Sequence, residues 1–129
     1  MDMSEEVKVL GRGWNYFRKF LDREKVDDSY WNDAVHECAS DTPYEHALSV
    51  VMLQELSAIK DFGKKSCEDR IYYNVFNDCV NLVKSDKTFT ECGKESISLT
   101  EKYKYYYGIN SFLKGMLEAT LEEIARREG

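Results

Sequence analysis

The stretch from Thr42 to Gly63 constrains the fold more than any other part of this sequence. It opens with Thr42-Pro43-Tyr44-Glu45, in which a threonine N-cap, a proline at the first helical position and a glutamate at the third form a capping box. Apolar residues then occur on nearly every side of the predicted helix, and Gly63 ends it. We therefore predict a helix that is buried at the centre of a helical bundle.

Two further helices are predicted before this one. Residues 7–21 carry apolar side chains at spacings of three and four, which is the period of a helix. Gly11 and Gly13 predict that this helix is broken near its start or begins at Gly13. Asp27 and the two polar residues after it offer N-caps for a second helix over residues 27–38.

The second half of the chain predicts two more helices with an irregular segment between them. Ser66 is expected to cap a fourth helix that continues to Val83. Ser98-x-x-Glu101 is a second capping box, and it predicts a long C-terminal helix of about 28 residues. Residues 84–97 are predicted to form a loop or a short strand.

Composition places these helices in one domain. The chain has 129 residues with a single proline, and its 43% hydrophobic and 33% charged content is typical of a soluble globular protein. No linker, repeat or low-complexity segment divides residues 1–129. The predicted fold is all-α: a single-domain bundle of about five helices, with a buried third helix and a long C-terminal helix.

The sequence predicts a cytoplasmic protein with free thiols. No apolar run approaches the roughly 18 residues of a membrane span, and the N-terminus is acidic where a signal peptide would be basic. Cys38, Cys67, Cys79 and Cys92 form no Cys-x-x-Cys pair. In a reducing compartment such cysteines stay reduced, and Cys38 and Cys79 fall on apolar helix faces.

Charge is distributed unevenly along the chain. No lysine or arginine occurs between Lys25 and Lys60, whereas the rest of the chain carries all 18 basic residues and 17 of the 24 acidic ones. We call residues 26–59 the acidic window. Its carboxylates are Asp27, Asp28, Asp33, Glu37, Asp41, Glu45 and Glu55.

The acidic window has two interpretations. It is either a solvated face with acids placed to match two helix dipoles, which accounts for most of the positions, or a patch that binds a basic protein surface. In the second interpretation Asp27, Asp28, Asp33, Glu37, Asp41 and Glu45 are the contact residues. Either way the window argues against direct binding of nucleic acid, which needs clustered lysine and arginine.

Spacing does not predict a metal site or a catalytic cluster. His36, Cys38 and His46 lack the paired spacings of a zinc site, and Asp33-x-x-His36 is a single pair where di-metal bundles use several. No motif joins a cysteine or serine to histidine and an acid, as nucleophilic catalysis requires. Glu55 is expected at the wet edge of its helix; the alternative is that it pairs with a lysine or tyrosine inside, and a buried carboxylate of this kind would be a site candidate. We therefore predict no catalytic residue, metal or cofactor.

The tyrosine-rich run at residues 102–107 predicts an interface. On a helix, Tyr103, Tyr106 and Tyr107 would share one side while Tyr105 points away into solvent, and exposed tyrosine is a favoured interface anchor. Gly108 and Gly115, seven residues apart, would let another helix approach closely.

Three segments within residues 14–62 carry a resemblance to other proteins: WNYFRKFL, SYWNDAVHECAS and DTPYEHAL. With them the chain resembles small acidic all-helical proteins encoded by bacterial prophages and integrative elements. The resemblance implies a cytoplasmic helical bundle without known catalytic residues. Some small acidic mobile-element proteins inhibit host defence nucleases, and the acidic window fits that role.

The sequence thus predicts a non-enzymatic protein–protein interaction module that binds a basic protein surface through an acidic patch at residues 27–45 and binds neither membrane nor nucleic acid. In one version it is a mobile-element inhibitor. Two alternatives remain open. One is a metal-dependent or hydrolytic enzyme using His36, Cys38 and His46. The other is a structural protein that forms homo-oligomers through its tyrosine-rich C-terminal helix.

Overall fold

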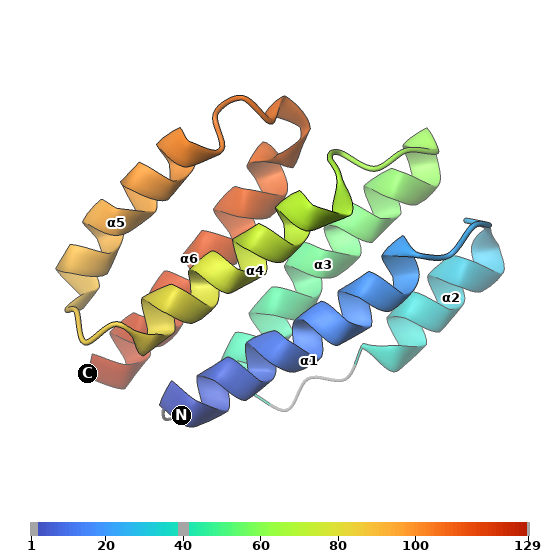
Figure 1. Ribbon diagram of the computed structural model, residues 1–129. Helices are drawn as coiled ribbons and strands as arrows, with labels where there is room; N and C mark the ends of the chain where they lie inside the picture. Colours follow the sequence, from blue (N-terminus) through green and yellow to red (C-terminus); the bar gives the residue numbers. More distant parts are fainter. Residues whose placement is uncertain (1–2, 39–41, 129) are drawn as a thin grey trace.

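The computed structural model of the protein describes residues 3–38 and 42–128, which form six α-helices and one 3-10 turn (Figure 1). The elements are α1 (Met3–Leu21), α2 (Asp28–Glu37), α3 (Pro43–Phe62), α4 (Asp69–Lys84), α5 (Phe89–Lys102), η1 (Tyr107–Ile109) and α6 (Asn110–Glu128). The all-α prediction is confirmed, with one helix more than expected. None of the described helices is long and apolar enough to cross a membrane.

Four helices build the centre of the bundle. α1 packs against α3 and α4, and α6 packs against the same two helices. α2 lies against α3 at one edge, and α5 lies against α6 at the other (Figure 1). A cluster of buried rings joins α1, α4 and α6: the Phe17 and Phe112 rings stack at 5.2 Å between centroids, and Tyr72 meets both edge-on.

Local signals set the ends of α3 and the start of α2 as predicted. The Glu45 N–H donates to Thr42 Oγ1 at 3.2 Å, and Gly63 ends α3 in the left-handed region with φ 72°. The Tyr30 N–H donates to Asp27 Oδ1 at 3.0 Å. α3 packs against α1, α2 and α6, while Val50 and Phe62 stay exposed.

Two expected boundaries are wrong. α1 runs unbroken through Gly11 and Gly13, and a Cβ on Gly13 would lie 3.3 Å from a carbon of the Phe76 ring, so this glycine serves packing. α4 begins after Glu68 and not after Ser66. The Ser66 hydroxyl is used elsewhere, since it donates to a buried carboxylate of α3.

The prediction of one long C-terminal helix is also wrong. Thr88 caps a separate helix, α5, by accepting from the Glu91 N–H at 3.2 Å, and Ser98-x-x-Glu101 lies inside that helix. The chain then turns at residues 103–109 and returns as α6 (Figure 1). Tyr103 fixes the turn, because its ring is buried and its hydroxyl donates to Asp78 Oδ2 at 2.5 Å.

The prediction of a close approach is confirmed at Gly115. A Cβ on this residue would lie 2.8 Å from Val51 Cγ2, so the absence of a side chain lets α6 and α3 pack closely. Gly108 also permits a close contact, although with a loop and not with a helix. A Cβ there would lie 2.9 Å from the Ser66 carbonyl oxygen.

Candidate functional site at the junction of α1, α2 and α3

Five of the seven carboxylates of the acidic window lie beside basic side chains that come from outside it. Three of these cations lie on or just after α1, one precedes α2, and Lys60 lies at the end of α3. The ion pairs are Arg12–Glu45 at 2.5 Å, Lys19–Glu37 at 2.8 Å, Arg23–Asp33 at 3.1 Å, Lys25–Asp27 at 3.6 Å and Lys60–Asp28 at 3.2 Å.

These pairs change the meaning of the acidic window. α1 lies beside α2 and α3 in space, so the separation of charges along the chain is not a separation on the surface. Exposed pairs of this kind contribute only about 0–1 kcal/mol each to stability. The side chains of Asp28 and Asp33 are still 95% and 54% exposed, so a partner can reach them. Asp41, the remaining predicted contact residue before Glu45, lies outside the described residues.

Asp27 has a structural role that accounts for its presence. The hydrogen bond from the Tyr30 N–H, followed by the neighbouring charge of Lys25, holds the pKa of the Asp27 carboxyl below its usual value. An ionised carboxylate at this position satisfies a free N–H at the start of α2 and matches the positive end of its dipole. This residue therefore fits the solvated-face interpretation.

A pocket of about 330 Å³ lies where α1, the end of α2 and α3 meet. We call it the junction pocket. Val9 of α1 and Leu48 and Met52 of α3 are buried apolar residues that line it. Its polar lining is Arg12, Tyr16, Glu37, Cys38, Glu45 and Ser49.

Tyr16 connects α1 to α2 beside this pocket. Its hydroxyl donates to the Ala34 carbonyl oxygen at 2.5 Å. Burial, and to a smaller extent the neighbouring Cys38 thiol, raises the pKa of Tyr16 well above its ordinary value. The phenol therefore stays protonated at any physiological pH and acts as a fixed donor, with its oxygen still able to accept a hydrogen bond.

The structure does not bring the predicted alternative site residues into a ligand cluster. His36 and His46 are exposed, and Cys38 is half-buried at the C-cap of α2. Within residues 3–38 and 42–128, no group of three or more histidine, cysteine or carboxylate side chains could hold a metal ion. The four cysteines are free thiols.

Glu55 is buried, contrary to the prediction that it lies at a wet edge. Its side chain accepts hydrogen bonds from the Ser66 hydroxyl at 2.6 Å and from the Tyr72 hydroxyl. Burial and the Glu55 carboxylate together raise the pKa of Tyr72 far above its usual value. Two donors compensate the cost of burying this charge, and they join α3 to the α3–α4 loop and to α4. We therefore assign Glu55 a structural role, because its hydrogen bonds hold these three segments together.

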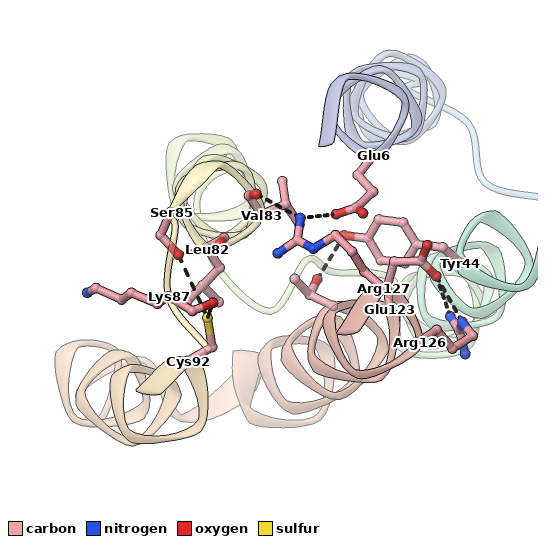
Figure 2. A network of polar contacts seen from close by, with 11 residues as sticks. Glu6, Tyr44, Leu82, Val83, Ser85, Lys87, Cys92, Glu123, Arg126 and Arg127 are labelled. Carbon is pink, nitrogen blue, oxygen red and sulfur yellow. Dashed lines mark hydrogen bonds and ion pairs between the residues drawn. The ribbon is translucent and has the colours of Figure 1, made fainter. Parts of the chain in front are cut away.

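Two other buried glutamates, Glu6 and Glu123, were missed by the sequence analysis. Figure 2 shows them on either side of Tyr44, whose hydroxyl lies 2.9 Å from Thr120 Oγ1. Arg127 donates to Glu6 at 3.1 Å, and Arg126 pairs with Glu123 at 2.7 Å. Only the Glu123–Arg126 spacing of three is visible in the sequence, because Glu6 and Arg127 lie at opposite ends of the chain.

The prediction that Tyr105 is exposed is confirmed, since its side chain is 75% accessible. The residue follows α5, and the Lys104 ammonium lies 5.3 Å from its ring centroid. The α5–α6 connection and α2 are far apart in the fold (Figure 1). Tyr105 and the acidic window therefore do not form one site.

A shallow apolar groove lies between α2 and α3, with a volume of about 360 Å³. Trp31 of α2 and Val50 and Leu53 of α3 line it, together with Gln54 and Ser57. Val50 is 41% exposed, so apolar surface is open to solvent here. No pattern in the sequence predicted this groove.

Comparison with known proteins gives no relative: no protein-family model matches the chain, and neither a curated protein nor a solved structure is significantly similar to it.

Proposed function

We propose that this protein is a non-enzymatic helical interaction module that binds a protein partner through α2 and the adjoining face of α3. The observation that carries the proposal is the groove formed by Trp31, Val50 and Leu53 next to exposed carboxylates. Asp28 and Trp31 lie one helical turn apart on α2, so an acidic group borders the apolar surface. The partner we expect has an apolar anchor flanked by basic side chains.

This arrangement matches the general anatomy of protein interfaces. An apolar centre supplies most of the binding energy and a polar rim supplies specificity, and tryptophan is among the residues enriched at energetic hot spots. Because the carboxylates already have cations beside them, we assign the larger share of the affinity to the groove. The carboxylates would chiefly set association rate and orientation.

The first test is a truncation at the centre of the groove. The purified chain is used to capture a partner from native host lysate, and the affinity of the identified partner is then measured directly. Trp31→Ala should weaken binding by at least about 30-fold, the cost of a hot-spot residue. Ile97→Ala, which truncates a 68% exposed side chain on α5, is the matched control and should change nothing. Equal affinities for both variants would refute the proposal.

The second test addresses the acidic rim. Asp33→Lys with Glu37→Lys should slow association with a basic partner, while circular dichroism shows the helical content unchanged. Glu91→Lys with Glu95→Lys makes the same charge change on α5. If the α2 variant binds at unaltered rate and affinity, the rim has no role. Inhibition of a host nuclease is a further proposal, and it rests on the resemblance to mobile-element proteins.

A further inference from the structure

We propose that the junction pocket binds a small amphipathic cation, an ammonium group attached to a compact hydrocarbon body. The pocket shares no lining residue with the α2–α3 groove. The proposal therefore does not rest on the interaction module and can fail or succeed independently of it.

The size and lining of the pocket select the hydrocarbon part. About 330 Å³ lies at the lower end of ligand-binding pockets and equals the liquid volume of roughly eleven waters. We therefore expect a small ligand of about ten non-hydrogen atoms. Val9, Leu48 and Met52 are each at most 3% exposed, so the pocket wall that they form is apolar.

The charges on the pocket select the cationic group. Among the residues that the structure describes, two carboxylates, Glu37 and Glu45, line the pocket, but only one cation does. That cation, Arg12, is held by Glu45 at 2.5 Å. Glu37 is bound by Lys19, whose ammonium is not part of the lining. Carboxylates therefore outnumber cations by one among the described lining residues, and Lys19 is the neighbouring cation that a bound ammonium group would share or displace at Glu37.

The helix ends and the neutral polar groups also favour a cationic ligand. α2 ends at Glu37, so the negative end of its dipole lies at the pocket. α3 begins near the same rim, but its positive end is already matched by Thr42 and Glu45. The Tyr16 hydroxyl donates its proton to Ala34 and lies beside the Cys38 thiol, and its oxygen can accept a hydrogen bond from an ammonium group.

The test compares three ligands of one shape and different charge. 2-Phenylethylammonium, 2-phenylethanol and phenylacetate are titrated into the intact isotope-labelled protein, and amide chemical shifts are followed by NMR. We expect the ammonium compound to shift the amides of Gly13, Leu48 and Ser49 and to bind about tenfold more tightly than the alcohol. The carboxylate should bind more weakly than either.

Variants locate the charge that matters. Glu45→Gln and Glu37→Gln should each weaken binding of the ammonium compound about fivefold while leaving the alcohol unchanged. Glu95→Gln, an isosteric change on α5, is the control and should have no effect. Cys38→Leu, which enlarges a half-buried lining residue, should weaken all three compounds alike.

Three results would overturn the proposal. If no compound shifts the pocket amides, the pocket is not a ligand site. If the alcohol binds as tightly as the ammonium compound, the carboxylates do not select the ligand. If the carboxylate compound binds best, Arg12 dominates the pocket and the predicted charge of the ligand is wrong.

Discussion

The ion pair between Glu6 and Arg127 joins the first and last helices, and its removal should be costly. Arg127 Nη1 donates to Glu6 Oε2 and to the Val83 carbonyl oxygen, both at 3.1 Å (Figure 2). Glu6 is 0% exposed, so Arg127→Met would remove the Arg127 cation from beside an interior carboxylate. Removing one partner of a buried pair costs roughly 3–5 kcal/mol.

The exposure of Arg127 narrows the expected cost of the Arg127→Met substitution. The Arg127 side chain is 22% exposed, so water can reach part of the space that it vacates, and we expect the lower figure of about 3 kcal/mol. Urea unfolding followed by circular dichroism measures it as a fall in midpoint of about 1–2 M at unchanged slope. For a domain whose total stability is about 5–15 kcal/mol, this is a large fraction.

A double-mutant cycle separates the pair from the rest. Glu6→Gln with Arg127→Met removes the buried charge together with its cation and should recover about half of the loss or more. Lys65→Met, which breaks an exposed pair with Asp69 at 2.7 Å, should cost less than about 0.5 kcal/mol. If Arg127→Met costs no more than Lys65→Met, or if the double variant is no more stable than the single one, the pair does not hold the helix ends together.

Three further predictions concern packing and the buried polar groups. Gly115→Ala places a Cβ 2.8 Å from a valine methyl of α3 and should destabilise the fold by about 1–3 kcal/mol in a urea titration. Gly11→Ala is the control: its Cβ meets nothing within 4 Å, so it should stabilise the fold by up to about 1 kcal/mol. A thiol reagent should label Cys92 before Cys79, although both are 0% exposed, because α5 buries a single side chain; equal rates would contradict this. Tyr72→Phe should cost about 1.5–3 kcal/mol in the same titration by removing a donor to a buried carboxylate, and a loss under 0.5 kcal/mol would contradict it.

Local signals predicted the parts of the fold that depend on neighbouring residues. The Thr42 cap, the Gly63 stop and the Asp27 cap each act within four residues, and each is where the sequence puts it. Such motifs satisfy free backbone groups at a helix end and need no tertiary contact.

The capping-box motif gave a wrong helix start where the sequence contains two such boxes ten residues apart. Thr88-x-x-Glu91 and Ser98-x-x-Glu101 have the same pattern, but the prediction used only the second and gave residues 84–97 as a loop or a short strand. The structure uses the first. The choice depends on Tyr103, whose burial and bond to Asp78 turn the chain after α5. That contact spans 25 residues and leaves no local pattern.

The candidate site shows the same limit in its charges. The acidic window is real in the sequence, yet Arg12, Lys19 and Arg23 neutralise much of it once α1 packs beside α2 and α3. Counting charges along a chain cannot detect this, because the order of helix packing decides which charges meet. The Trp31 groove was hidden for the same reason, since periodicity identifies an apolar face but not whether another helix covers it.

The paired carboxylates have a consequence for how the proposed partner binds. A basic partner must share or displace Lys19 and Arg23, which already lie at 2.8 and 3.1 Å from the carboxylates of α2. The net electrostatic gain is then small, because one exposed ion pair replaces another. Binding centred on Trp31 should therefore weaken only slightly between about 0.05 and 0.5 M salt, whereas binding by an open acidic patch would weaken steeply over the same range. A steep salt dependence in the wild type that is abolished by Asp33→Lys with Glu37→Lys would contradict this prediction. It would show that the carboxylates, and not the groove, supply most of the binding energy.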